Sequence, residues 1–215
     1  MRLTANLTLI VISVVLSFTS CQKEINPLDP IDVNGNTPGS GTGNTNSITG
    51  EYNFAGLTSD TYSSVVVTSQ GSELRAVTVS NYITKNNVGT VNITATNIMF
   101  TGVGYLIDTT ANAKTYLDGV LFDDSDVPFV LSYPPTNTSY PYTRINLDSL
   151  NLTGPLGVSN PSGAIPIGTV GAKLRWSGDT LLIQIKSSVA QTISQGGVPG
   201  ALTGYANGIL KLKKR

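Results

Sequence analysis

The strongest constraint on the fold is a two-residue alternation of apolar and polar side chains that recurs along the chain after about residue 48. In its clearest instance, three apolar residues alternate with three polar ones: Val91, Ile93 and Ala95 with Asn92, Thr94 and Thr96. Successive side chains of a β-strand point to opposite faces, so this pattern predicts a half-buried strand. Helical periodicity is almost absent. The sequence therefore predicts an all-β domain.

Short turn signals separate the expected strands. Asp118–Gly119 predicts a tight hairpin, because both residue types accept the positive φ angles of a type I′ turn. Residues 70–72, 86–89 and 177–179 predict further turns. About eight to ten strands would follow one another in antiparallel order. Closure into a barrel best hides the sheet edges, and it would place the first strand, around Tyr52, beside the last, around Leu210. The expected fold is an antiparallel up-and-down β-barrel. A transmembrane barrel is the alternative, which the short strands and few aromatic residues disfavour.

The first 21 residues predict where the protein is located. Arg2 precedes a mostly apolar run over residues 3–18, which is shorter than the roughly 20 residues of a membrane-spanning helix. The run ends in small Thr19 and Ser20 directly before Cys21, and this ending resembles the lipobox of bacterial lipoproteins. The resemblance implies a signal peptide over residues 1–20, a diacylglycerol on Cys21, a flexible linker over residues 21–47 and a folded domain over residues 48–215. A plain secretory signal followed by an accidental cysteine is the alternative.

The lipid predicts a membrane partner and a compartment. One acyl chain binds a bilayer only marginally, whereas several chains on one cysteine hold a protein permanently. Gln22 replaces the aspartate that retains many lipoproteins in the inner membrane, so we expect the outer membrane, on either its periplasmic or its cell-surface side.

Composition excludes several function classes. The chain of 215 residues contains no histidine, a single cysteine, and 13 basic against 13 acidic residues. The missing histidine removes Ser–His–Asp and Cys–His catalysis and the commonest zinc ligand. The balanced charge disfavours nucleic-acid binding. We therefore expect no enzyme activity and no cofactor.

The whole domain resembles the lipocalin-like lipoproteins of Bacteroidetes. Gly50–Glu51–Tyr52 is similar to the Gly-x-Trp opening of lipocalins, and Leu174 and Trp176, followed by a turn and a further strand, are similar to a late strand pair. The resemblance implies a calycin-type barrel that binds a small apolar ligand. The expected pocket is the barrel interior, lined by six residues: Tyr52, Phe54, Val77, Val91, Ile93 and Trp176.

Two other segments carry alternative functions. Tyr133, Tyr140 and Tyr142 flank a proline-stiffened stretch that is expected to be a loop, where aromatic rings either stack on a glycan or cover the barrel mouth. Asp123, Asp124 and Asp126 form an acidic cluster, which is either a calcium loop or, more simply, a solvated turn without a metal. A surface protein that captures glycans or nutrients, and a purely structural lipoprotein, thus remain alternatives to the ligand-binding barrel.

Overall fold

The computed structural model describes residues 47–153, 169–195 and 198–215, and the expected signal peptide, Cys21 and most of the linker lie outside these ranges. The described residues form nine β-strands and contain no helix long and apolar enough to cross a membrane. The strands are β1 (Gly50–Ser69), β2 (Ser72–Ile83), β3 (Lys85–Ile93), β4 (Asn97–Leu117), β5 (Val120–Arg144), β6 (Ser149–Thr153), β7 (Thr169–Ser177), β8 (Thr180–Gln195) and β9 (Val198–Lys214).

The strands form one antiparallel sheet whose hydrogen bonding closes into a ring, as expected for an up-and-down barrel. β9 pairs with β1 from Tyr52 opposite Lys214 to Val67 opposite Gly200, which confirms the predicted contact between the first and last strands. β2 and β3 together occupy one position in the ring, because each pairs with a different half of β1 and of β4.

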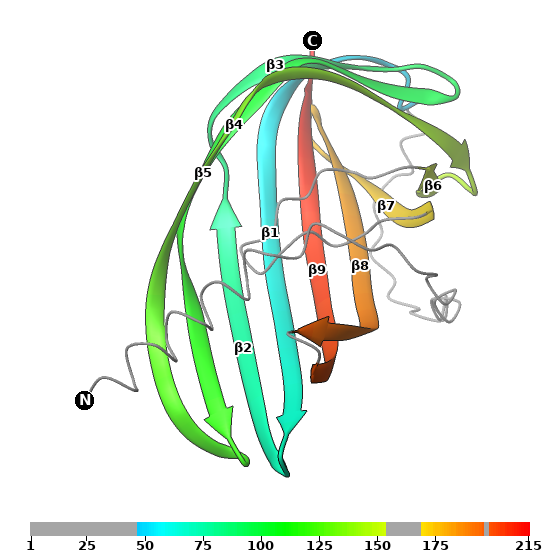
Figure 1. Ribbon diagram of the computed structural model, residues 1–215. Helices are drawn as coiled ribbons and strands as arrows, with labels where there is room; N and C mark the ends of the chain where they lie inside the picture. Colours follow the sequence, from blue (N-terminus) through cyan, green and yellow to red (C-terminus); the bar gives the residue numbers. More distant parts are fainter. Residues whose placement is uncertain (1–46, 154–168, 196–197) are drawn as a thin grey trace.

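In the part of the chain that the structure describes, the barrel is complete at one end only. β6 pairs with the last residues of β5, Tyr142–Arg144, and β7 pairs with β8 only as far as Ile185. Beyond these points, among the described residues, β5 pairs with β4 alone and β8 with β9 alone. Figure 1 shows the long strands descending past the short β6 and β7 as a curved, open wall. We call the complete part the closed end and the remainder the open half.

Three tight turns follow the local sequence. Gln70–Gly71 and Asp118–Gly119 have positive φ at both residues, which matches the type I′ turns of two-residue hairpins. Gly178 supplies the positive φ of the turn between β7 and β8. The hairpin predicted at Asp118–Gly119 is confirmed.

The predicted turn at residues 86–89 is wrong, because this segment lies within β3. Its pairing with β4 slips twice, between Lys85 and Val88 and between Val88 and Thr90. Asn86 and Gly89 have φ angles of 51° and 101°. Asn and Gly supply positive φ for a β-bulge as well as for a turn, so composition alone does not separate the two.

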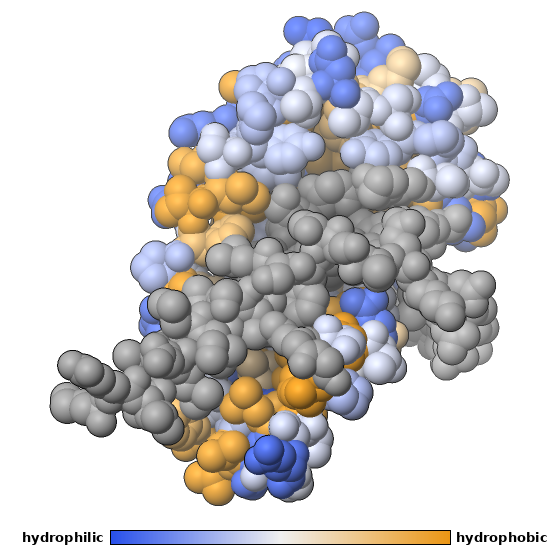
Figure 2. Space-filling model, in the orientation of Figure 1, coloured by the Kyte–Doolittle hydropathy of each residue, from blue (hydrophilic) through white to orange (hydrophobic). Residues whose placement is uncertain are grey.

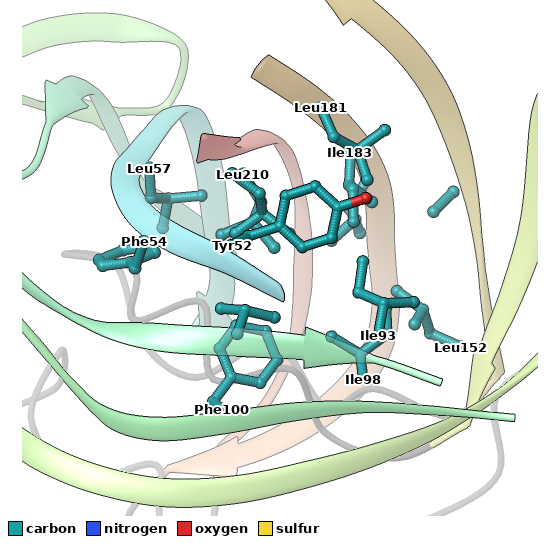
Figure 3. Packing of buried hydrophobic residues seen from close by; sticks show 14 of the residues in the cluster. Tyr52, Phe54, Leu57, Ile93, Ile98, Phe100, Leu152, Leu181, Ile183 and Leu210 are labelled. Atoms are coloured by element: carbon teal, nitrogen blue, oxygen red, sulfur yellow. The ribbon is translucent and has the colours of Figure 1, made fainter. Parts of the chain in front are cut away.

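The core fills the closed end and continues into the open half at Ile107, which is opposite Leu131. Eleven large side chains are under 2% exposed or at that limit, and they come from most strands of the ring: Ile48, Tyr52, Val91, Ile93, Ile98, Ile107, Leu150, Leu152, Leu181, Ile183 and Leu212. Figure 3 shows that the labelled members converge from opposite walls. Burial of such side chains contributes about 1.5–3 kcal/mol each, so the closed end holds the ring together.

The outer face of the wall is mixed. Ion pairs join Lys85 to Asp108 at 2.8 Å and Lys114 to Asp124 at 3.2 Å. Apolar residues are exposed where the β4–β5 hairpin ends, among them Val120, Leu121 and Phe122, and Figure 2 shows apolar surface over this lower end.

Candidate functional site

A partly open cavity lies where the closed end meets the open half. Its volume is about 80 Å³. Eleven residues from β1, β4, β5, β8 and β9 line it: Phe54, Leu57, Phe100, Val103, Tyr105, Tyr133, Thr136, Thr138, Tyr140, Ile185 and Leu210. We call this the junction cavity. Because β6 does not reach past Tyr142 on β5, the cavity lies at the point where the barrel wall opens.

Aromatic rings form the β4–β5 side of the junction cavity. Tyr105 and Tyr133 are opposite each other in the sheet and stack, with centroids 5.0 Å apart and planes 9° apart. The rings of Phe100 and Tyr140 meet edge to face, with centroids 5.6 Å apart. The ring centroids of Phe54 and Tyr105 are 5.9 Å apart. Such ring pairs add stability beyond their buried area. The wall therefore offers flat apolar ring surfaces to the cavity.

The electrostatics of the junction cavity are neutral. None of its lining residues is acidic or basic in the part of the chain that the structure describes. Burial raises the pKa of Tyr105 well above its ordinary value, and the neighbouring phenols Tyr82, Tyr133 and Tyr140 raise it further. The Tyr105 phenol therefore stays protonated at neutral pH and acts as a neutral polar group rather than as a base.

Five of the six expected ligand-binding residues face the barrel interior. Tyr52, Phe54, Val91 and Ile93 are at most 5% exposed, and Trp176 packs partly buried against the core. The Tyr52 hydroxyl donates a 2.6 Å hydrogen bond to the carbonyl oxygen of Ile48, and the Tyr52 ring lies 6.3 Å from that of Trp176. Only Phe54 lines the junction cavity. The other four pack the core of the closed end and do not line the junction cavity.

The placement of Val77 in the barrel interior is wrong. Val77 is opposite Ser64 on β1 and Lys114 on β4, whereas its neighbour Thr78 is opposite Ser63 and Ala113. The buried Tyr82 has the same parity as Thr78, so even-numbered residues of β2 face inward and Val77 faces outward. Small polar side chains line the concave face of the sheet here. The apolar residues that alternate along β2 near Val77 therefore lie on the outer face.

The expected tyrosine loop is also wrong, since residues 133–142 continue β5. Tyr133 and Tyr140 turn their rings into the junction cavity instead of presenting them on a surface. Tyr142 is 7% exposed and donates a 2.7 Å hydrogen bond to the carbonyl oxygen of Thr94. The glycan-stacking interpretation of this segment loses its geometric basis.

The acidic cluster lies inside β5 rather than in a turn. Asp124 and Asp126 both accept hydrogen bonds from Asn112 on β4, at 2.9 and 3.1 Å. Hydrogen bonds from Asn112 and Lys114 lower the pKa of Asp124. The described residues include no group of three or more acidic, histidine or cysteine side chains placed to hold a metal ion.

Sequence reasoning missed most of the residues at the junction cavity. Phe100 and Leu210 each have one polar neighbour, and Tyr105 lies between Gly104 and Leu106, so local alternation is weak. Nothing local shows that they converge on the same space as Thr136 and Thr138. That convergence depends on where β6 stops, which is a property of the whole ring.

Comparisons with known proteins add little. No family model matches the chain, and no curated protein matches it. One matching solved structure is the crystal structure of Ail, the attachment invasion locus protein of Yersinia pestis. The alignment covers 76% of this chain and 99% of that one, with 7% identity and a TM-score of 0.18. A similarity this weak carries no argument about fold, location or activity.

Proposed function

We propose that the protein is a non-catalytic lipoprotein of the outer membrane, anchored through an acylated Cys21, whose barrel holds the end of a small apolar ligand in the junction cavity. The observation that carries this proposal is the cavity itself, an uncharged aromatic space at the opening of the barrel wall. Lipocalin-like proteins, which the sequence resembles, bind such ligands inside a barrel.

The size of the junction cavity limits what enters it. Its volume is about 80 Å³. Typical small-molecule sites measure about 300–1,000 Å³. A whole ligand therefore does not fit. The terminal methylenes of an acyl chain do, and the rest of the chain would extend into the open half.

The outer surface supports a barrel that faces water. The ion pairs Lys85–Asp108 and Lys114–Asp124 lie on the wall formed by β3, β4 and β5. A lipid-facing wall disfavours charges at such positions. Attachment to the membrane would then depend on Cys21 and not on the sheet.

A purely structural role is the second candidate, and the packing of the closed end favours it. Leu150, Leu181 and Leu212 are each fully buried there, as expected of a filled core. A structural protein needs no ligand, so direct binding separates the two functions.

The binding test uses a fluorescent fatty acid and two matched threonine variants of the full-length chain. Thr138→Phe places a ring in the junction cavity, and Thr110→Phe places the same ring on the exposed face of β4. We expect wild type and Thr110→Phe to bind the probe with equal affinity and Thr138→Phe to bind at least about tenfold more weakly. Equal far-UV circular dichroism checks that both variants fold. If wild type does not bind, the structural role holds.

The anchor is tested separately by growing cells with radiolabelled palmitate. Wild type is expected to carry label and to fractionate with the outer membrane, whereas Cys21→Ser is expected to carry none and to be released. An unlabelled wild-type protein would remove the anchor and leave the cavity proposal standing.

A further inference from the structure

A second hollow, independent of the barrel interior, lies on the outer face of β6, β7 and β8. Its volume is about 540 Å³, within the range of small-molecule sites. Lys173 and Gln184 are opposite each other in the sheet, and they face away from the buried Leu174 and Ile183. We call this hollow the outer groove.

Gly171 deepens the outer groove. A Cβ atom built at Gly171 would meet only the Oδ1 atom of Asn151, at 3.9 Å. Gly171 is exposed and lies opposite Asn151 in the β6–β7 pairing. The missing side chain therefore leaves open space above the strand backbone, between polar side chains on either side.

A hydrogen-bonded turn builds one rim of the groove. The Arg144 Nε atom donates to the carbonyl oxygen of Asn146 at 2.8 Å. The Asn146 Oδ1 atom accepts hydrogen bonds from the Asp148 backbone N–H at 3.0 Å and the Ser149 hydroxyl at 2.6 Å. These contacts fix Asn146, Asp148 and Ser149, all of which line the groove.

The groove presents two cations and one carboxylate. Lys186 is two residues beyond Gln184 on β8, so it is a diagonal neighbour of Lys173, at about 7–8 Å between backbones. The four ion pairs among the described residues involve Lys85, Lys114, Lys213 and Arg215, and neither groove lysine. Asp148 is the only acidic residue that lines the groove in the described chain.

The remaining polar groups suit hydroxyls. Gln184 donates its Nε2 hydrogen to Asn207 at 2.8 Å, which leaves the Gln184 carbonyl oxygen to accept. Asn151 offers both an amide donor and an acceptor, and Asp148 accepts only. Paired lysines attract a carboxylate, while these acceptors bind hydroxyl donors. Inorganic phosphate lacks a set of hydroxyls that would match the acceptors.

We propose that the outer groove binds an acidic saccharide, with the sugar carboxylate between Lys173 and Lys186 and ring hydroxyls on Asp148, Asn151 and Gln184. This binding site is separate from the junction cavity and goes beyond the proposed function. The acidic saccharide would lie on the outer face of the sheet, whereas the apolar ligand of the junction cavity would lie on its inner face.

The test is calorimetric titration of the full-length chain with trigalacturonate, and with its methyl ester as the neutral matched ligand. We expect saturable one-to-one binding of trigalacturonate and at least about tenfold weaker binding of the ester, because a charged hydrogen bond contributes at least that factor. Inorganic phosphate serves as a competitor and is expected not to displace the saccharide.

Four variants locate the site. Lys173→Gln and Lys186→Gln remove one charge each and are expected to weaken binding about tenfold or more. Gly171→Trp fills the hollow and is expected to abolish binding. Lys114→Gln, on β4, removes an ion-paired lysine outside the groove and is expected to bind as wild type. Circular dichroism checks folding. Absence of wild-type binding, equal binding by all variants, or displacement by phosphate would each overturn the proposal.

Discussion

At the scale of single residues, a few side chains do two things at once. Tyr52 fills the closed end with its ring and fixes the start of the domain with its hydroxyl, which donates to the Ile48 carbonyl oxygen at 2.6 Å. Ile48 is 2% exposed, so water does not replace this donor readily.

Tyr52→Phe is therefore expected to lower the free energy of unfolding by about 1–3 kcal/mol, the cost of an unsatisfied buried acceptor. Urea unfolding measures it. Tyr205→Phe is the matched control, because Tyr205 is half exposed on the outer face, and its change is expected to stay within about 0.5 kcal/mol. Equal losses in both variants would contradict the role of the hydroxyl.

The buried phenols also predict how stability depends on pH. Burial raises the pKa of Tyr52, Tyr82, Tyr105 and Tyr142 above the ordinary value of a tyrosine. Below about pH 10, all four are neutral in both the folded and the unfolded state, and the full stability is present. As the pH rises further, the unfolded chain ionises first, so the folded state loses stability progressively toward the folded-state pKa values. Urea midpoints measured from about pH 8 to about pH 11 are expected to fall, and less steeply in Tyr105→Phe. An unchanged slope in that variant would contradict the assignment.

At the scale of elements, glycine sets where strands approach and bend. Gly89, at φ 101°, sits in the β3 bulge, where an added Cβ would lie 2.5 Å from the Gly102 carbonyl oxygen. Gly89→Ala combines an unfavourable φ with a backbone clash and is expected to cost at least about 2 kcal/mol. Gly171→Ala is the control, because the space around Gly171 is open, and it is expected to change stability by no more than about 0.5 kcal/mol. Thermal unfolding of both variants measures the difference, and a mild effect at Gly89 would mean that the bulge relaxes.

Local sequence signals predicted some turns and strand faces of the barrel correctly and others wrongly. The hairpin at Asp118–Gly119 and the inward positions of Tyr52, Val91 and Ile93 were predictable, because turn chemistry and alternation are local. Val77 was misplaced, because near it the concave face of β2 carries the small polar Thr78 and Ser80, whereas the valines lie on the outer face. The prolines of residues 133–142 predicted a loop. Proline is tolerated in this segment because most of it pairs on one side only, as on an edge strand. The groove over β6–β8 has no sequence signal, since it depends on neighbours that meet only in the sheet.

At the scale of the whole molecule, one sheet is both a closed barrel and an open wall, and hydrogen exchange distinguishes the two parts. Strands β1 and β9 are each paired on both sides at the closed end, so slow exchange is expected at consecutive backbone amides around Leu210 and Leu212.

In the open half, residues 120–132 of β5 pair with β4 alone within the described chain. Alternate amides there lack a partner strand and are expected to exchange much faster than those between them. Residues 186–194 of β8 supply an internal repeat of the same test, because among the described strands they pair with β9 alone. Uniform protection along β5 would mean that another strand completes the wall and narrows the opening beside the junction cavity, which would leave no room for the rest of an acyl chain. Fast exchange at alternate amides together with binding of the fatty acid would instead connect the incomplete wall directly to ligand entry.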